Sequence, residues 1–521
     1  MYREIVKNMT LEEKIGQMLC LAYLGTEYDE QMKNLIEKYK IGTIILFARN
    51  IIDLEQVYRL NTEIHKHSKY PMFIGLDHEG GMVRRVMKDI TYLPGAMALY
   101  NADDEELYSI YNQVGKELRQ LGFNMNYMPT VDVNNNPFNP VINSRSYSDN
   151  PTVVSQKSIV AVHAMQDACV LPTPKHFPGH GNTNVDSHVG LPVVELNKDE
   201  LYEVELKPFQ EVIKAGTDGI MISHILYKKL DEVYPATLSK NIITDLLKKE
   251  MGYENLIITD SLTMAAIYQR YPVREIIKRS INAGNDIIMF CGEANDYEQE
   301  LIFSEFVSLV KNGEIPMERI EESVLKVMRL KEKYKVELGN NCLDKNTIEE
   351  SFNVKKELAE KLTEKSITLY KDNGILPLKE NDKVLSLFPK INLVTLVDNS
   401  GNDTTTIGKV LNCDEIIYDK NNAISLENIV QKAQKYDKII LATYNVKADD
   451  YQSQLFKSLD PNKVICVALR SPYDILQMPN CGTYICTYDC TNESIKALCN
   501  DLVKNQFSVK LPVNLDIKGE K

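Results

Sequence analysis

The sequence predicts an α/β protein of two parts, a (β/α)8-like barrel of the TIM type followed by a smaller α/β sandwich. Two observations lead to this prediction. The chain has 521 residues, too many for one ordinary domain of roughly 100–200 residues. Short β-branched apolar runs also alternate with longer amphipathic stretches along most of it. Hydrophobic residues at 44% and charged residues at 26% are typical of a globular protein, which excludes a disordered chain.

Seven apolar runs are the expected strands of the first part, and helical stretches such as 151–168 separate them. Periodicity alone allows either a closed barrel or an open doubly wound sheet. The polar residues favour the barrel, because Asp77, Lys175 and Asp260 each come just after a run and so belong to one rim. In an open sheet such residues would gather at a single switch point. The runs are 41–47, 72–76, 124–128, 170–172, 219–223, 256–258 and 286–290.

A change of composition marks the boundary between the two parts. A charged helical stretch over 319–333 gives way to Gly-Asn-Asn-Cys-Leu-Asp at 339–344. We therefore expect a barrel domain over 1–335, a linker over 336–350 and a sandwich domain over 351–521. No histidine follows His224, so the chemistry is expected in the first domain. The expected strands of the second domain are 384–388, 393–397, 416–418, 439–444, 464–469 and 484–487.

Charge and hydropathy exclude several partners. The net charge of −13 repels polyanions and no basic patch interrupts it, so no nucleic-acid partner is expected. No apolar run approaches the roughly 20 residues of a membrane helix, and the first ten residues lack an apolar signal segment. We expect no membrane contact and a cytoplasmic location. The ten scattered cysteines fit reduced thiols in that compartment.

The densest group of chemically active side chains lies in the loop 175–188, Lys-His-Phe-Pro-Gly-His-Gly-Asn-Thr-Asn-Val-Asp-Ser-His. It holds three of the eight histidines of the chain. Asp186 stands two residues before His188 and can hydrogen-bond one imidazole nitrogen while the other faces a substrate. The pair is therefore a candidate proton-transfer dyad.

No metal and no cofactor are expected. Pro178 and Gly179 break any helix that would place His176 and His180 on one face as metal ligands. The cysteine cluster at 481–499 lacks the paired spacings of a zinc ribbon.

Five separated segments of the first domain form a recognisable set. They are Asp-His-Glu-Gly-Gly-Met-Val-Arg-Arg at 77–85, Asn-Ser-Arg-Ser-Tyr at 143–147, Pro174, the loop 175–188 and Ile-Thr-Asp-Ser-Leu at 258–262. In this order they resemble glycoside hydrolase family 3, and within it the bacterial β-N-acetylglucosaminidases of the NagZ type. The resemblance implies a barrel followed by an α/β sandwich, and it covers the second domain only weakly.

The resemblance also implies an activity and a set of site residues. The activity is exo-acting, retaining hydrolysis of terminal N-acetylglucosamine, with saccharides from cell-wall peptidoglycan as substrates. Asp260 takes the role of the nucleophile, and His188 that of the acid/base, oriented by Asp186. The side chains implied to hold the sugar are Asp77, Arg85, Arg145, Lys175 and His176.

Three positions depart from the family pattern, and these departures affect details of the contacts in the site, not the catalytic residues. His78 stands where the family often has glutamine, Tyr147 where it often has phenylalanine, and Ser261 where a second acidic residue is common.

Residue chemistry agrees with these roles and leaves alternatives open. A retaining glycosidase needs a carboxylate at the anomeric carbon and a second group that gives and then takes a proton. A histidine base is neutral and does not repel phosphate, so a phosphorylase on the same scaffold is the first alternative. A sugar sensor without catalysis is the second, and the complete set of Asp186, His188 and Asp260 argues against it. Because the chain has no tryptophan, a pocket for one terminal sugar fits better than a long aromatic cleft.

Overall fold

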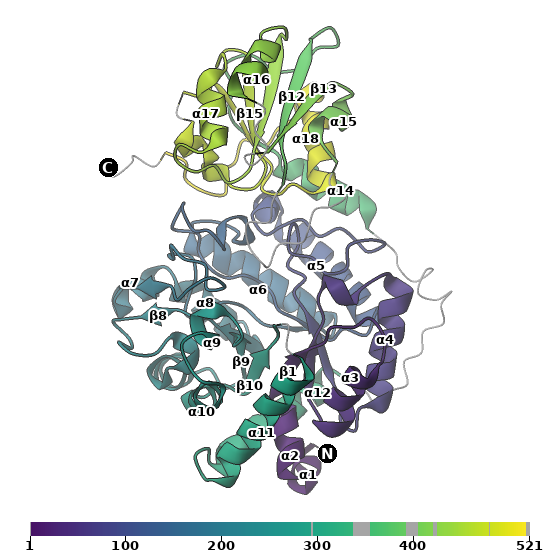
Figure 1. The fold of residues 1–521 in the computed structure, drawn as a ribbon, viewed down its shortest axis with the longest axis vertical. Coiled ribbons are helices and arrows are strands. Elements are labelled where there is room, and N and C mark those ends of the chain that lie inside the picture. The colour runs from purple at the N-terminus through teal and green to yellow at the C-terminus, as the bar shows by residue number, and fades with distance from the viewer. Residues whose placement is uncertain are drawn as a thin grey trace.

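The computed structural model describes residues 2–292, 295–336, 355–391, 405–419, 425–478 and 480–516. A larger purple-to-teal body and a smaller green-to-yellow body lie one above the other (Figure 1). Apart from Val336, the expected linker over 336–350 lies outside the described residues, as does the expected strand over 393–397.

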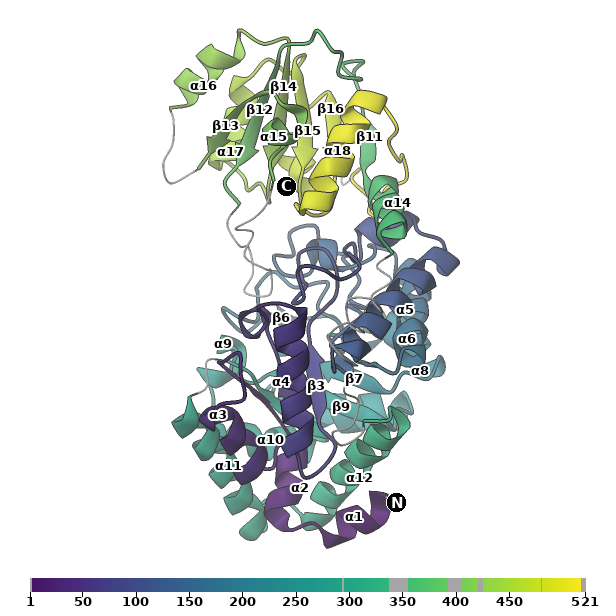
Figure 2. The same ribbon diagram turned by 90° about the vertical axis from the view of Figure 1, so that its right-hand side faces the viewer.

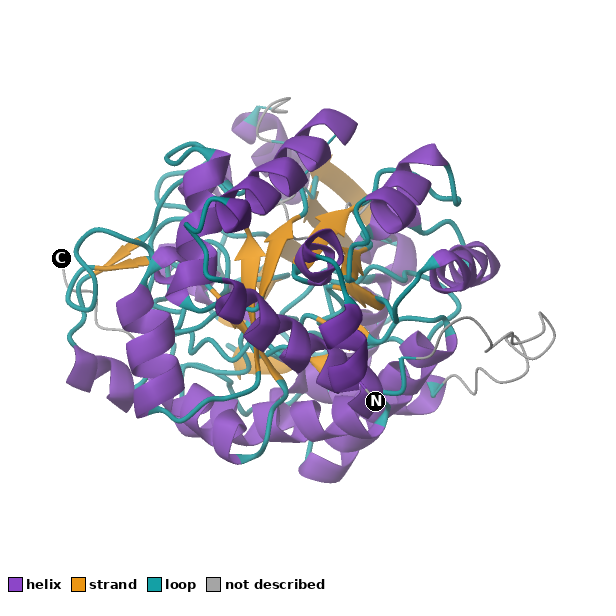
Figure 3. Cartoon of the chain, turned by 90° about the horizontal axis from the view of Figure 1, so that it is seen from below, coloured by secondary structure: helices purple, strands orange, loops and turns teal. Residues whose placement is uncertain are grey.

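Eight parallel strands form the sheet of the larger body, in the order β5-β4-β3-β2-β1-β10-β9-β7. Beyond β5 the chain reaches the far edge of the sheet, where Phe177 N donates to Met221 O at 2.8 Å and Ser223 N donates to Phe177 O at 2.9 Å. The barrel is therefore nearly closed, and helices surround its central strands (Figure 3). This confirms the predicted fold. The strands are β1 (Leu19–Ala22), β2 (Thr43–Ile45), β3 (Phe73–Leu76), β4 (Met125–Asn126), β5 (Leu171–Pro172), β7 (Gly219–Ile222), β9 (Leu256–Ser261) and β10 (Ile287–Phe290).

Several helices around the barrel, among them α2, α4, α5 and α6, begin where the sequence supplies a capping side chain. In α6, Pro151 occupies the first turn and the Asn150 side chain accepts from Thr152 N, which confirms the predicted start. A π-helical segment, η6 (Asn241–Glu250), covers the predicted helix after Ser239. The remaining helices are α1 (Tyr2–Asn8), α2 (Leu11–Gln17), α3 (Glu30–Lys33), α4 (Leu54–His67), α5 (Asp104–Gln120), α6 (Pro151–Asp167), α7 (Lys198–Glu203), α8 (Leu206–Lys214), α9 (Ala265–Tyr268), α10 (Val273–Ala283), α11 (Asp296–Lys311) and α12 (Met317–Lys333).

Apolar side chains fill the barrel interior at the amino end of its strands. Phe73, Leu256 and Ile287 are the first residues of their strands, and they pack in one buried cluster with Val327 and Leu330 of α12. This helix therefore closes the amino end of the barrel, and the chemistry belongs at the carboxyl end. No helix in the described ranges is long and apolar enough to cross a membrane.

The smaller body is a six-stranded sheet in the order β11-β16-β15-β14-β12-β13, parallel except for the edge strand β11. Neighbouring residues of β14, Ile440 and Leu441, belong to separate buried clusters, so both faces of the sheet are covered as an α/β sandwich requires. The elements are β11 (Thr368–Lys371), β12 (Val384–Pro389), β13 (Asp414–Tyr418), β14 (Lys438–Thr443), β15 (Val464–Ala468), β16 (Thr483–Cys486), α14 (Lys356–Ser366), α15 (Ile407–Leu411), α16 (Leu426–Ala433), α17 (Tyr451–Ser458), η7 (Pro472–Gln477) and α18 (Asn492–Lys504).

The sheet domain packs on the barrel at the carboxyl end of its strands (Figure 2). Tyr92, on the loop after β3, bonds Asp489 at 3.2 Å and Thr491 at 2.8 Å. On the loop after β4, Asn143 Nδ2 donates to Ser471 Oγ at 3.0 Å. The second domain therefore covers two of the loops that build the active-site rim.

Candidate active site

The predicted catalytic and sugar-binding side chains lie on loops at the carboxyl end of the barrel strands. Asp77 follows β3 directly, Lys175 lies just beyond β5, and Asp260 is the last but one residue of β9. Because the carboxyl ends of parallel strands meet at one rim, these groups converge. The other predicted residues come from the same loops: Arg85 after β3, Arg145 after β4, and His176, Asp186 and His188 after β5.

A buried chain of alternating charges links three of these loops. Arg85 Nη2 lies 3.5 Å from Asp77 Oδ2, and Lys175 Nζ donates to Asp77 Oδ1 at 2.8 Å. Lys175 Nζ also lies 2.6 Å from Glu79 Oε1. Arg145 donates a hydrogen bond to each carboxylate oxygen of Glu79, at 2.9 and 2.8 Å. A contact through two hydrogen bonds fixes the direction of the Arg145 and Glu79 side chains as well as their distance. The row of ion pairs therefore orients the side chains that form it.

Glu79 and Lys175 stay charged despite their burial. Burial would raise the pKa of Glu79, but Arg145 and Lys175 outweigh it and hold that pKa well below its ordinary range. Burial would lower the pKa of Lys175, and Asp77 together with Glu79 raises it instead. Within this network three cations face two carboxylates, and the ionised Asp260 adds a third carboxylate to the same pocket, so the charges balance while the cations remain as hydrogen-bond donors.

His176 is held by Asp132, which is completely buried. Asp132 Oδ2 accepts from His176 Nδ1 at 2.7 Å, while Oδ1 accepts from the backbone N–H groups of His176 and His180 at 3.1 and 2.6 Å. The carboxylate fixes the imidazole in one orientation and leaves its Nε2 for the pocket.

The imidazole of His180 makes its hydrogen bonds within the loop 175–188. Its ring nitrogens contact Thr183 Oγ1 at 2.8 Å and Ser187 Oγ at 3.2 Å, and burial lowers its pKa to about 4, so it is neutral. The loop packs tightly here, because a Cβ on Gly181 would lie 1.6 Å from Val133 O. Only glycine fits at that position.

His188 and Asp186 form the predicted dyad. His188 Nδ1 donates to Asp186 Oδ1 at 2.8 Å, and the backbone N–H of His188 donates to the same oxygen at 2.9 Å. Burial would raise the pKa of Asp186, but these contacts lower it. The His188 side chain is 21% exposed, so an ionised carboxylate orients an imidazole that solvent and substrate can reach.

Asp260 is kept ionised by its surroundings. Burial would raise its pKa, but the imidazoles of His224, His176 and His188 and the N–H of Ser261 lower it to about 2. Ser261 N donates to Asp260 Oδ1 at 2.7 Å. His224 Nε2 donates to Ser261 O at 2.7 Å and so lies beside the carboxylate. At neutral pH Asp260 is a carboxylate, the state that a nucleophile needs.

One small pocket collects these groups. Its volume is about 80 Å³, and apolar side chains such as Phe47 and Met289 form part of its wall. Asp186 does not line it and acts through His188. The predicted residues that line the pocket are Asp77, Arg85, Arg145, Lys175, His176, His188 and Asp260.

Two of the three departures from the family pattern have hydrogen-bond partners inside the fold, whereas the buried Nε2 of the third, His78, has none among the described residues. The Tyr147 hydroxyl lies 2.6 Å from the Tyr111 hydroxyl, so the extra oxygen relative to phenylalanine has a partner. Burial lowers the pKa of His78 to about 3 and keeps it neutral, as glutamine would be. Ser261 Oγ lies 2.7 Å from Thr263 Oγ1.

Sequence reasoning missed two residues of the site. Glu79 stood inside a quoted motif, yet its role depends on Lys175 and Arg145, which are distant in sequence. Asp132 stood in no quoted motif, and its only sequence signal was an aspartate just beyond an expected strand. In the described part of the chain, no group of three or more His, Cys, Asp or Glu side chains is placed to hold a metal ion.

A nearly closed barrel with ionisable groups converging at its carboxyl rim defines a barrel enzyme. The family profile "Glycosyl hydrolase family 3 N terminal domain" matches residues 10–330. The chain therefore belongs to glycoside hydrolase family 3, and it is a glycoside hydrolase.

Individual relatives agree with this assignment. Beta-hexosaminidase A of Pseudoalteromonas piscicida is 35% identical over 421 residues, 73% of this chain and 70% of that protein. Beta-hexosaminidase of Psychromonas ingrahamii is 32% identical over 277 residues, 52% of this chain and 81% of that protein. The solved family 3 β-N-acetylglucosaminidase of Paenibacillus sp. str. FPU-7 is similar in fold, with a TM-score of 0.89, 32% identity, and coverage of 98% of this chain and 100% of that chain.

Glu79→Gln tests the buried chain of charges. The substitution removes the anion between Lys175 and Arg145 and leaves two buried cations without it. Breaking such a pair costs about 2 kcal/mol or more, which is about thirtyfold in kcat/KM. We expect that loss on an aryl β-glycoside substrate, with Glu195→Gln, which breaks only the exposed pair with Lys228, as the control. An unchanged kcat/KM in a folded Glu79→Gln protein would contradict the role given to the chain.

Proposed function

We propose that this glycoside hydrolase is an exo-acting, retaining β-N-acetylglucosaminidase. The observation that carries the proposal is the single pocket that Asp260 shares with His188, whose partner is Asp186. An ionised carboxylate and an oriented imidazole are the two groups that a double displacement at an anomeric carbon requires. The names of the relatives, β-hexosaminidase and β-N-acetylglucosaminidase, support the choice of sugar.

The proposed reaction has two balanced steps. In the first, an oxygen of Asp260 forms a bond to the anomeric carbon as the glycosidic C–O bond breaks, and His188 Nε2–H gives its proton to the departing oxygen. In the second, water attacks the anomeric carbon, His188 takes a proton from that water, and Asp260 leaves as a carboxylate. Asp186 stays ionised throughout and stabilises the imidazolium that carries the proton.

The remaining predicted residues hold the terminal sugar. Lys175, Arg145 and Arg85 supply fixed donors for hydroxyl groups, and Asp77 supplies an acceptor. His176, fixed by Asp132, offers one more hydrogen-bonding nitrogen. The small volume of the pocket fits one terminal ring better than a chain of rings, which supports exo action.

Peptidoglycan fragments are the proposed natural substrates, and the cytoplasm is the proposed compartment. The nine cysteines in the described ranges are all free thiols, and six of them are buried. Free thiols are typical of a reducing compartment. Fractionation of the producing cells, with muropeptides supplied to each fraction, tests both parts of this proposal.

Asp260→Asn tests the nucleophile. The amide cannot form the glycosyl ester, so kcat on an aryl N-acetylglucosaminide should fall by about 10⁴-fold while the fold is retained. Asp245→Asn, at an exposed position of η6, is the matched control and should be fully active. In the wild-type protein, a slow-turnover fluorosugar should label the peptide that contains Asp260. A label on another residue would exclude Asp260 as the nucleophile.

The dyad is tested by comparing leaving groups. Asp186→Ala should slow turnover by roughly 10²–10⁴-fold, because the imidazole loses its orientation and a charge partner. His188→Ala should slow the first step strongly for a sugar leaving group and only weakly for nitrophenolate, which needs no proton. The exposed His163→Ala is the control. If His188→Ala slows the first step equally for both leaving groups, His188 is not the acid.

Phosphorolysis on the same pocket is the second candidate. The observation that favours it is the imidazole base, His188, which shares one pocket with the cations Arg85, Lys175 and Arg145. A carboxylate base would repel an incoming phosphate by about 4 kcal/mol per unit charge at about 4 Å and an effective dielectric of about 20. Neutral His188 imposes no such barrier.

Product analysis in phosphate buffer decides between the two candidates. If the base charge selects the acceptor, wild-type protein forms some sugar 1-phosphate of retained configuration, and His188→Glu suppresses that product more than it suppresses hydrolysis. Free N-acetylglucosamine alone at high phosphate would exclude phosphorolysis and leave the hydrolase.

A further inference from the structure

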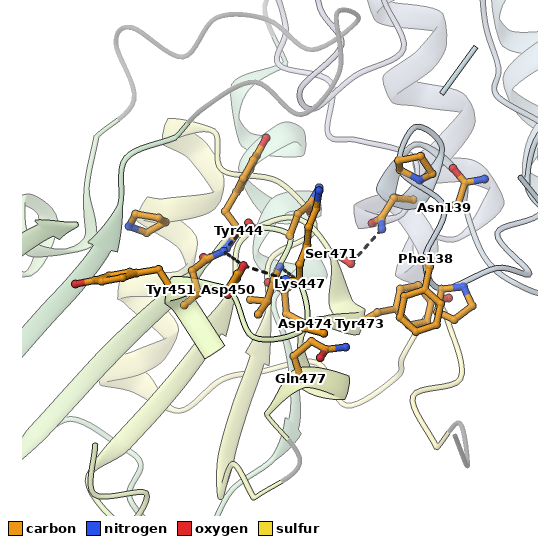
Figure 4. Close-up of a pocket in the computed structure, with 18 of the residues that line it drawn as sticks. Phe138, Asn139, Tyr444, Lys447, Asp450, Tyr451, Ser471, Tyr473, Asp474 and Gln477 are labelled. Atoms are coloured by element: carbon orange, nitrogen blue, oxygen red, sulfur yellow. Dashed lines mark hydrogen bonds between the residues drawn. The ribbon is translucent and has the colours of Figure 1, made fainter. Parts of the chain in front are cut away.

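A second cavity lies between the two domains, apart from the catalytic pocket. Its volume is about 640 Å³, within the range of about 300–1,000 Å³ that is common for ligand sites. Figure 4 shows Tyr444, Tyr451 and Asp450 on the side of the sheet domain, and Phe138 and Asn139 on the side of the barrel. None of the residues that line it lines the catalytic pocket.

The cavity occupies the place where an open parallel sheet binds ligands. Chain order gives β12, β13, β14, β15, but β13 and β14 lie on opposite sides of β12, so the strand order reverses between β12 and β14. Crevices at the carboxyl ends of the strands beside such a reversal are the usual ligand sites of these sheets. Pro389 at the end of β12 and Tyr444 just beyond β14 both line the cavity.

A buried acceptor on the barrel side lacks a partner. Asn143 is 4% exposed, and its Nδ2 donates to Ser471 Oγ at 3.0 Å, while its Oδ1 accepts no hydrogen bond from any described residue. Its backbone has a φ of 42°, a left-handed conformation that non-glycine residues rarely adopt. An unpaired buried carbonyl oxygen costs free energy unless a donor meets it. A ligand hydroxyl or amide N–H in the cavity would supply that donor.

The walls combine aromatic rings with hydrogen-bonding groups. Phe138 is 67% exposed and lines the cavity. Tyr451 and Tyr418 stack obliquely, with ring centroids 5.9 Å apart. Aromatic faces beside amide groups are suited to ligands that have both apolar C–H faces and hydroxyl groups.

The cavity carries charges of both signs, because Lys390 and Lys447 line it together with Asp450 and Asp474. Asp474 is fully buried and accepts from Thr443 Oγ1 at 2.7 Å and from Val446 N at 2.9 Å. Asp450 accepts from Ser453 N at 2.9 Å and so caps α17. Both carboxylates are used by the protein, and burial raises the pKa of Asp474 to about 7. Because lysines and carboxylates offset one another, the charges favour no single sign of ligand, and the aromatic rings beside hydrogen-bonding groups point to a polyhydroxylated ligand.

We propose that this interdomain cavity is a second saccharide-binding site, separate from the catalytic pocket. The segment 137–145 joins the two sites, because Phe138, Asn139 and Asn143 line the cavity while Val141 and Arg145 line the catalytic pocket. Asn139 Nδ2 also donates to His180 O at 2.8 Å, within the catalytic loop. The site holds either the distal part of a long substrate or a separate saccharide molecule.

Calorimetric titration tests the proposal on the full-length protein. The probe is triacetylchitotriose, and the titration uses the Asp260→Asn variant so that the probe is not hydrolysed. Only the choice of this sugar rests on the proposed function. Phe138→Ala with Tyr451→Ala should weaken binding at the cavity by roughly tenfold or more. A separate saccharide gives two binding events, of which the double variant weakens one and leaves the other unchanged. One trisaccharide that spans both sites gives a single event, which the double variant weakens. Tyr297→Ala, which removes an equally exposed aromatic ring on α11, should leave binding unchanged.

Kinetic measurements and titrations with other sugars distinguish the distal part of a substrate from a separate saccharide. In the wild-type background, a loss of kcat/KM for the trisaccharide but not for an aryl monosaccharide identifies the ligand as the distal part of the substrate. Unchanged kinetics with a lost binding event identify a separate saccharide. Titration with cellotriose and maltotriose extends the test to other neutral sugars. If the double variant binds all three trisaccharides as the parent does, or the parent binds none of them, the proposal is wrong. Failure of the proposed function is seen independently, as absent hydrolysis of an aryl N-acetylglucosaminide by the wild-type protein.

Discussion

The active site depends on one constraint, the mutual neutralisation of charges that the barrel rim buries. Lys175 is 2% exposed, and Glu79 and Arg145 are 6% and 7% exposed, which would be costly for isolated ions. Each ion is tolerable only because its partners come from a different strand. The loops after β3, β4 and β5 therefore have to meet in one arrangement, and that arrangement places the groups that we propose bind the sugar. The buried ion pairs among Lys175, Glu79 and Arg145 therefore couple the packing of the three loops to the positions of the site residues.

Carboxylates also orient the imidazoles of the site. Asp132 holds His176, and Asp186 holds His188, each through Nδ1, so that both rings can present Nε2 to the pocket. Asp260 lies among these rings and remains ionised. The ionised state of Asp260, the proposed nucleophile, thus depends on imidazoles from the loops after β5 and β7.

Most of the barrel was predictable from sequence because its strands are short β-branched runs followed by polar residues. The strand β1 (Leu19–Ala22) was missed because it follows α2 almost without a break and offers neither a turn signal nor a polar residue at its end. The edge strand β11 (Thr368–Lys371) was missed because its sequence, Thr-Leu-Tyr-Lys, is only partly buried and does not form a β-branched apolar run. Glu79 and Asp132 were missed for another reason, since their roles arise from contacts across the barrel that no local pattern encodes.

The second domain gains a physical role from its position. It packs on the loops after β3 and β4, whose other side lines the catalytic pocket, so its contacts stabilise segments that carry site residues. Those contacts depend on side chains of both domains, such as Tyr92 with Thr491 and Asn143 with Ser471. Sequence patterns predicted each domain separately but contained no signal for their relative placement.

The central claim is that Asp260 and the dyad of His188 and Asp186 carry out two successive displacements in one pocket. The most direct measurement is the configuration of the first product, followed by proton NMR in the minutes before mutarotation. Two displacements predict that the β-anomer of N-acetylglucosamine appears first and the α-anomer grows in later. The α-anomer appearing first would mean a single displacement by water and would contradict the account.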